Sequence, residues 1–142
     1  MQNELLEQYK LYVEMADRII QRRHATNRFY ISLLTGLGGL YLLLYKTRDY
    51  PNALLWVIIT AVISLLWWIN IYYYRQLNSG KFKVIFEMEQ HLPFACYDRE
   101  WEILGRGKHN RLYLNLSKVE SYIPFTLIIL CLTYIGYRMW FI

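Results

Sequence analysis

Three long stretches of this chain contain no Asp, Glu, Lys or Arg: residues 29–45, 51–74 and 121–137. Each helix of a water-soluble domain needs a polar face, so three uncharged stretches are rare in a soluble chain of 142 residues. The composition points the same way, because 56% of the residues are hydrophobic and only 19% are charged. The sequence therefore predicts an all-α integral membrane protein.

The lengths of the apolar runs predict two membrane-spanning helices, residues 29–45 and 53–74, and favour a third, residues 123–142. The first run would extend roughly 25 Å at about 1.5 Å per residue, the short end for a span, and the second is long enough. Only residues 46–52 separate these two runs, so we expect an antiparallel hairpin with a short outer loop. The third run carries Arg138 near its end, where the side chain can reach the headgroups. An amphipathic or re-entrant segment is the alternative for that run.

The distribution of Lys and Arg predicts the orientation of the chain. Thirteen of the 16 lie in residues 1–28 and 75–122, against three in the 46–52 loop and the C-terminal run. Cytoplasmic loops carry the excess of Lys and Arg in membrane proteins. We therefore expect the N-terminus and residues 75–122 to face the cytoplasm. The sequence pI of 9.2 follows from this topology, so nucleic acid is not an expected partner.

Residues 1–28 have the apolar spacing of a cytoplasmic amphipathic helix. Apolar positions recur at intervals of four and three residues, and polar residues fill most of the opposite face. About three heptads are too few for a stable isolated coiled coil, so we expect this stripe to pack on residues 75–122 or on neighbouring copies. The stripe consists of Leu5, Tyr9, Tyr12, Ala16 and Ile19.

The cytoplasmic segment 75–122 is expected to be a set of short helices. The Asn-Ser-Gly sequence at residues 78–80 predicts a break after the second span, followed by a helix over residues 81–92 that Pro93 stops. Asp98 is the expected N-cap of the next short helix, and Gly105 its expected end.

Small and polar residues within the spans indicate where helices approach each other. Ser32, Gly36 and Gly39 lie on nearby turns of the first span, and small residues let membrane helices pack closely. We therefore expect this face to contact another helix. Asn70, the most polar side chain of the second span, has two open interpretations: a hydrogen bond across an oligomer, or contact with headgroup water.

No arrangement of residues predicts a cofactor or a metal ion. Glu87, His91, Cys96 and Asp98 lie close together in sequence, but they lack a recognised ligand spacing and Pro93 interrupts them. Solvation and interfacial packing explain these residues more simply. Catalysis by Cys96 would need an activating base, which the sequence does not indicate. We expect a protein that is not an enzyme.

A basic loop precedes the third apolar run. Its cations suit contact with an anion or a lipid headgroup, and ordinary juxtamembrane charge that sets topology is the competing interpretation. The loop residues are Arg106, Lys108, His109 and Arg111.

Several segments resemble the RipA family of bacterial membrane proteins: the arm LLEQYKLYVEMADRIIQRRHATNRFY, the two-span hairpin, ILGRGK at residues 103–108 and LSKVESYIPF at residues 116–125. The resemblance implies a small protein of the bacterial inner membrane that forms octamers, linked to stress tolerance and growth inside hosts. The layout is also similar to the SLATT effectors, two-span proteins proposed to permeabilise membranes in nucleotide-signalled antiphage systems. The long apolar C-terminal run departs from that two-span pattern, and neither family supplies catalytic residues.

Three functional hypotheses follow. The first is a non-enzymatic homo-oligomer of the bacterial inner membrane, an octamer with a channel, pore or scaffold role in stress tolerance. The second is a pore-forming effector triggered by a small molecule or protein through the Arg106–Arg111 loop. The third is a membrane-bound enzyme that uses Glu87, His91 and Cys96.

Overall fold

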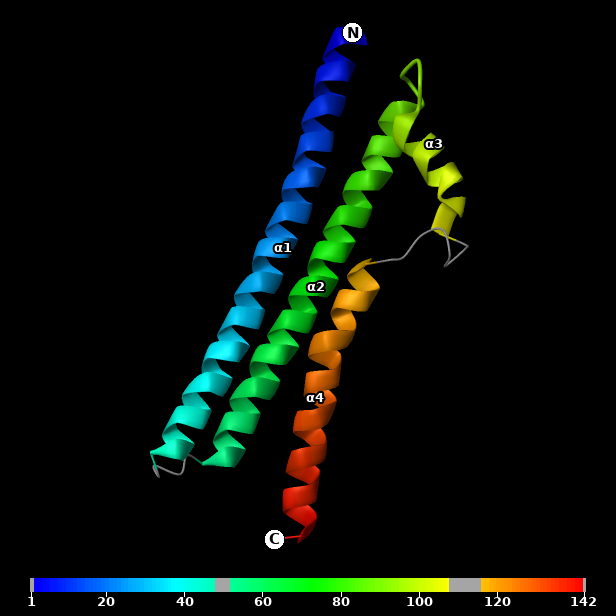
Figure 1. The fold of residues 1–142 in the computed structure, drawn as a ribbon. Helices are drawn as coiled ribbons and strands as arrows, with labels where there is room; N and C mark the ends of the chain where they lie inside the picture. Colours follow the sequence, from blue (N-terminus) through cyan, green and yellow to red (C-terminus); the bar gives the residue numbers. More distant parts are fainter. Residues whose placement is uncertain (1, 48–51, 108–115, 142) are drawn as a thin grey trace. The chain divides into compact units, whose positions relative to one another are not determined.

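The computed structural model describes residues 2–47, 52–107 and 116–141, and all regular elements within these ranges are helical. They are the α-helices α1 (Gln2–Lys46), α2 (Ala53–Glu89), α3 (Cys96–Ile103) and α4 (Leu116–Phe141), and the short 3-10 helix η1 (Gly105–Gly107) (Figure 1). The predicted all-α class is confirmed.

Three of these helices are long and apolar enough to cross a membrane. They are the described helical segments Asn3–Lys46, Ala53–Glu89 and Lys118–Trp140, which contain the three apolar runs. None of the residues in the most apolar window of α1 is buried within the chain. Large apolar side chains such as Leu42 and Leu130 are more than half exposed. Lipid or neighbouring protein must cover these surfaces, which agrees with a membrane protein.

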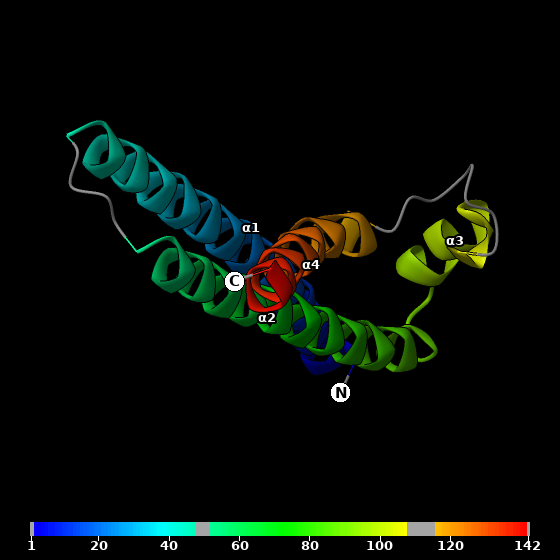
Figure 2. The same ribbon diagram turned by 90° about the horizontal axis from the view of Figure 1, so that it is seen from below.

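The first two long helices are uninterrupted, as Figures 1 and 2 show. α1 joins the N-terminal arm to the first span without a break. The break predicted at residues 78–80 is wrong, because α2 continues through Gly80 to Glu89. A glycine inside a helix costs only about 1 kcal/mol relative to alanine, and the packing of Ile85, which is fully buried, outweighs that cost.

The short helix α3 begins differently from the prediction and ends as predicted. Its N-cap residue is Ala95, which makes no side-chain capping bond, and Asp98 lies in the first turn rather than at the cap. The predicted end at Gly105 is confirmed. The backbone of Gly105 has φ 69°, a left-handed conformation that glycine adopts without strain.

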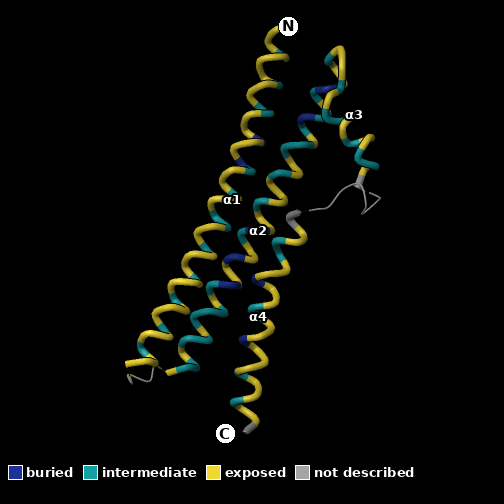
Figure 3. The backbone as a smooth tube through the Cα atoms, in the orientation of Figure 1, coloured by how far each residue is buried: buried dark blue, intermediate teal, exposed yellow. Residues whose placement is uncertain are grey.

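The chain divides into two units, and both α1 and α2 contribute to each. Unit 1 comprises Met1–Arg23 and Tyr73–Lys118, and unit 2 comprises His24–Tyr72 and Val119–Ile142. Figure 3 marks in dark blue the few buried positions of each unit. Among the residues whose burial the structure describes, they are Ala16, Ile19, Ile85 and Glu89 in unit 1, and Ser64, Trp67, Ile71, Pro124 and Cys131 in unit 2.

Candidate functional site

The most buried ionisable side chain in the described part of unit 1 is Glu89, the last residue of α2. It is 2% exposed, and its carboxylate accepts three hydrogen bonds. Tyr9 Oη and the backbone N–H of Tyr97 each donate to Oε1 at 2.8 Å, and the backbone N–H of Asp98 donates to Oε2 at 3.0 Å. Glu89 therefore supplies, from another helix, the cap that Ala95 cannot provide for α3, and we call this group the Glu89 cap.

The electrostatics of the Glu89 cap follow from burial. Desolvation raises the pKa of Tyr9 well above its usual value, and the hydrogen bond to Glu89 raises it further. Burial also raises the pKa of Tyr97, and the charge of Asp17 adds to the effect. The phenol of Tyr9 thus stays protonated and remains a donor to the carboxylate at physiological pH. The amides at the start of α3 favour a negative charge at the same place.

A second contact in unit 1 joins α1 to α2 through a cation. Lys81 Nζ lies 4.5 Å from the centroid of the Tyr12 ring, and it lies 3.7 Å from Met15 Sδ. An ammonium group over an aromatic face is attracted by the ring quadrupole. The contact places Tyr12, a residue of the predicted stripe, against α2 of the same chain.

Unit 2 contains an interhelical cluster of polar and aromatic residues, which we call the Trp67 cluster. Trp67 Nε1 donates to Asn27 Oδ1 at 2.9 Å, and Asn70 Nδ2 donates to Tyr30 Oη at 3.0 Å. The Tyr30 and Trp67 rings are stacked with centroids 5.9 Å apart. Asn70 therefore has its partner within the chain, which neither sequence interpretation anticipated. The cluster links α1 to α2 by two side-chain hydrogen bonds and one stacked pair of rings.

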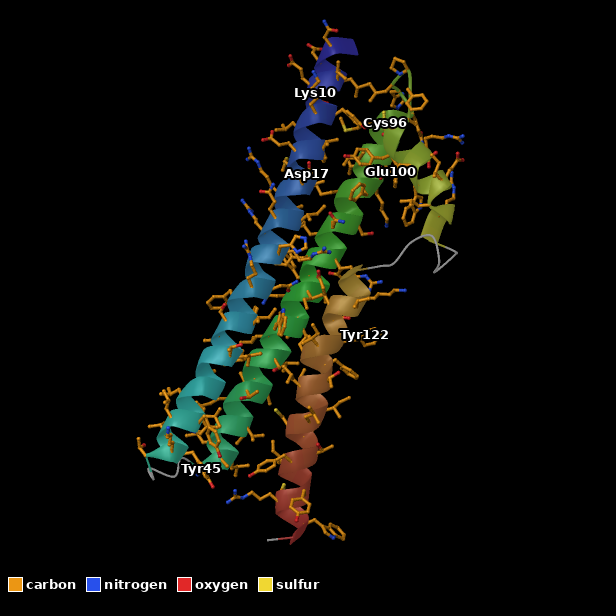
Figure 4. All side chains as sticks on the ribbon, viewed as in Figure 1. Lys10, Asp17, Tyr45, Cys96, Glu100 and Tyr122 are labelled. Carbon is orange, nitrogen blue, oxygen red and sulfur yellow. The ribbon has the colours of Figure 1, made fainter. Side chains whose placement is uncertain are left out.

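A cavity of about 480 Å³ lies in unit 1 between α2 and α3, and we call it the α2–α3 cavity. Four aromatic side chains and three charged ones line it, together with Asn78, Ser79 and Leu104. Figure 4 labels Glu100, the acidic member of the lining, and Cys96 on α3. The lining thus combines aromatic rings with charged and amide side chains.

The pattern of one protein family matches nearly the whole chain. The match is to the octameric membrane protein family (8xMP), and it covers residues 6–140. The chain belongs to this family. Among curated proteins and solved structures, none matches the chain. Together, the family and the three apolar helices make the chain a membrane protein of an octamer-forming family.

In this family member, the residues of the predicted stripe face the interior of unit 1. Leu5, Tyr9 and Tyr12 are half-buried, and Ala16 and Ile19 are buried. Since these contacts are within one chain, the stripe packs α1 on α2. Whether part of it also contacts a second copy stays a prediction.

The small residues predicted to pack in the membrane are on the open side of α1. Ser32, Gly36 and Gly39 are exposed. A Cβ added at Gly36 or Gly39 would meet no atom of the chain within 4 Å. The helix backbone is therefore accessible along this face of the 8xMP chain.

The basic loop is only partly placed. Arg106 has φ 50° and forms ion pairs with Asp98 at 3.3 Å and with Glu102 at 3.2 Å. Hydrogen bonds from Arg99 and Arg106 lower the pKa of Glu102. Lys108, His109 and Arg111 lie outside the described residues. Arg106 is the predicted anion-binding residue that the structure describes, and its guanidinium is paired with two carboxylates of the same chain.

The side chains considered for metal binding or catalysis lie in the last turn of α2, in the segment that follows it and at the start of α3. Glu87, His91 and Cys96 are exposed. Within residues 2–47, 52–107 and 116–141, no three His, Cys, Asp or Glu side chains are grouped to hold a metal ion.

Sequence reasoning missed Glu89, although its position carried a signal. Glu89 lies four residues after Ile85 and seven after Phe82, on the apolar face of the same helix. An acidic residue on such a face indicates a buried carboxylate, which is stable there only if hydrogen-bond donors surround it.

Proposed function

We propose that the chain assembles into an octameric ring in the bacterial inner membrane, with unit 1 in the cytoplasm. The ring acts without enzymatic activity, as a channel or scaffold that supports stress tolerance in the manner of RipA-like proteins. Membership of the octameric membrane protein family supports this assembly. The excess of Lys and Arg in residues 1–28 and 75–122 supports the orientation.

The observation that carries the proposal is the open face of α1. Ser32, Gly36 and Gly39 leave a shallow surface between large apolar neighbours such as Leu33 and Leu40, both exposed. Lipid tails gain little by filling such a surface, whereas another helix can approach closely and gain dispersion contacts. We assign this face to the contact between copies of the chain.

Filling the open face is expected to disrupt the octamer. In the double variant Gly36→Leu and Gly39→Leu, the new side chains would hold the neighbouring helix away. In mild detergent, mass photometry should show the wild type near eight times the 17.3 kDa chain mass, and the variant at smaller assemblies. If the ring is a channel, liposomes containing the wild type should show ion flux, and liposomes containing the double variant should not.

The matched control is Gly136→Leu, because Gly136 is on α4 and is equally open to a new Cβ. It should leave the oligomer intact. An octamer that survives the double substitution on α1 would remove this face from the interface and contradict the proposal.

The two cysteines allow the orientation to be tested without introducing a label site. Cys96 is exposed in unit 1, and Cys131 is buried in unit 2. A membrane-impermeant maleimide is expected to label Cys96 in inverted membrane vesicles and not in intact spheroplasts, because unit 1 is placed in the cytoplasm. A Cys96→Ser variant should abolish the signal. Labelling of intact spheroplasts at Cys96 would reverse the orientation.

A further inference from the structure

The α2–α3 cavity has the size of a small-molecule site. Its volume of about 480 Å³ lies within the range of roughly 300–1,000 Å³ that ligand pockets occupy. All its lining residues belong to unit 1, and they come from the last four turns of α2 and from α3 with its C-cap. Apart from Tyr97, whose backbone N–H belongs to the Glu89 cap, none of the lining residues is part of that cap or of the open face of α1. The cavity therefore needs an explanation of its own.

Aromatic rings from both helices line the cavity. Phe82 and Phe86 are on α2, and Tyr97 and Trp101 are on α3. The rings of Phe82 and Tyr97 meet edge to face with centroids 5.5 Å apart, and Phe82 and Phe86 are 6.3 Å apart. Aromatic side chains in such number offer faces and edges to a planar ring, and nucleic-acid bases stack on aromatic side chains whatever their sequence.

Two cations belong to the same lining. Arg75 and Lys83 are eight residues apart on α2, about 12 Å along the helix, and both are exposed. Neither forms an ion pair with an acid among the residues that the structure describes, unlike Arg18, Arg99 and Arg106. Guanidinium and ammonium groups at the edge of an aromatic pocket suit a phosphate or carboxylate.

The polar groups of the lining suit the edge of a heterocycle. Asn78 Oδ1 is buried and has no hydrogen-bond partner within the described residues. A buried acceptor of this kind is normally satisfied by a donor, and an amide can present either its oxygen or its nitrogen. Glu100 adds an acceptor from α3. Amide and carboxylate side chains pair with the amino groups of bases.

From these features we propose that the α2–α3 cavity binds a nucleotide. The base lies among Phe82, Phe86 and Trp101, its edge is recognised by Asn78, and its phosphate is bound by Arg75 and Lys83. The inference does not depend on the octamer or on a channel, because every residue involved belongs to one unit of one chain. Since Arg75 and Phe86 are on the helix that also contains the second apolar run, a bound nucleotide would contact a helix that enters the membrane.

The experiment is a calorimetric titration of the purified full-length protein, in nanodiscs of phosphatidylcholine, with AMP, GMP, CMP and UMP. At least one of the four is expected to bind with Kd below about 1 mM. Adenosine and ribose 5-phosphate, tested as the separated halves when AMP binds, should each bind at least about tenfold more weakly, because each lacks one of the two recognised parts.

Variants separate recognition from folding. Arg75→Gln and Trp101→Ala are each expected to weaken binding about tenfold or more, and Trp101→Phe should restore most of it because the ring is retained. The matched charge control is Arg99→Gln, an exposed arginine of α3 that pairs with Glu102 and is not among the residues lining the cavity. It should bind as the wild type does.

Three results would overturn the proposal. One is the absence of binding by all four nucleotides at millimolar concentration. The second is equal binding of ribose 5-phosphate and AMP, which would show a site for phosphate groups alone, as in a lipid headgroup. The third is an equal loss of binding in Arg99→Gln and Arg75→Gln, which would show that general charge and not the cavity attracts the anion.

Discussion

Replacing Glu89 with alanine is expected to destabilise unit 1 by about 3 kcal/mol. The substitution removes the acceptor of three hydrogen bonds in a place that is 2% exposed. Tyr9 Oη and the backbone amides of Tyr97 and Asp98 would then be left without that partner away from water, which costs about 1–3 kcal/mol for each group that stays buried. Amide hydrogen exchange of residues 96–104, measured by mass spectrometry, should become much faster as α3 loses its cap.

Graded variants test whether the effect arises from the carboxylate. Tyr9→Phe removes one of the three bonds and should cost about 1 kcal/mol, and Glu89→Gln should fall between it and alanine because an acceptor oxygen remains. The control is Glu87→Ala, an exposed acid two residues earlier on α2, which should change exchange very little. Equal protection in Glu89→Ala and the wild type would mean that the Glu89 cap does not hold α3.

Local patterns predicted the helices because membrane burial and amphipathicity each depend on the order of residues within a short stretch of sequence. The uncharged runs predicted the three apolar helices, and the four-and-three spacing predicted the stripe that includes Ala16 and Ile19. The end of α3 at Gly105 was predictable for the same reason, since a glycine is the residue that adopts the required φ without strain.

Contacts between distant residues were not predictable in this way. The continuity of α2 through Gly80 depends on packing around Ile85, which a local propensity for a turn does not include. The cap of α3 comes from a side chain seven residues before its first residue, not from the Asp98 that local capping rules favoured. Asn70 and Tyr30 are 40 residues apart in sequence, so their bond requires the register of the hairpin.

The candidate site was the least predictable part. The predicted anion site was placed on the basic loop, where the described Arg106 is paired with Asp98 and Glu102. The cations that line the cavity, Arg75 and Lys83, were counted only as determinants of topology. A cavity forms only when α3 folds back beside α2, and one-dimensional spacing does not indicate which residues then meet. Because Arg75 and Lys83 already fitted the charge distribution that predicts membrane orientation, the sequence offered no reason to consider them as binding residues.

Replacing Trp67 with alanine is expected to destabilise unit 2 by about 3 kcal/mol. Trp67 is 2% exposed, its ring stacks on Tyr30, and its Nε1 donates to Asn27 Oδ1 at 2.9 Å. Within a bilayer, lipid solvates an exposed apolar side chain well, so the loss arises mainly from dispersion contacts in the vacated space and from the unpaired Asn27 oxygen. Unfolding by sodium dodecyl sulfate, followed by circular dichroism, should begin at a lower detergent fraction.

The adjacent Trp68 is a close control, since it has the same side chain on the next position of the same helix. It is 39% exposed and stacks on Tyr72 of its own helix, so Trp68→Ala should cost less than about 1 kcal/mol. Trp67→Phe keeps a ring for Tyr30 but removes the N–H, and it should lie between the two alanine variants. Because lipid can solvate both indoles once the helices separate, the two positions differ in the burial of Trp67 and in its contacts with Asn27 and Tyr30 of α1. Equal sensitivity of Trp67→Ala and Trp68→Ala would therefore contradict the Trp67 cluster as the contact that holds α1 to α2 in unit 2.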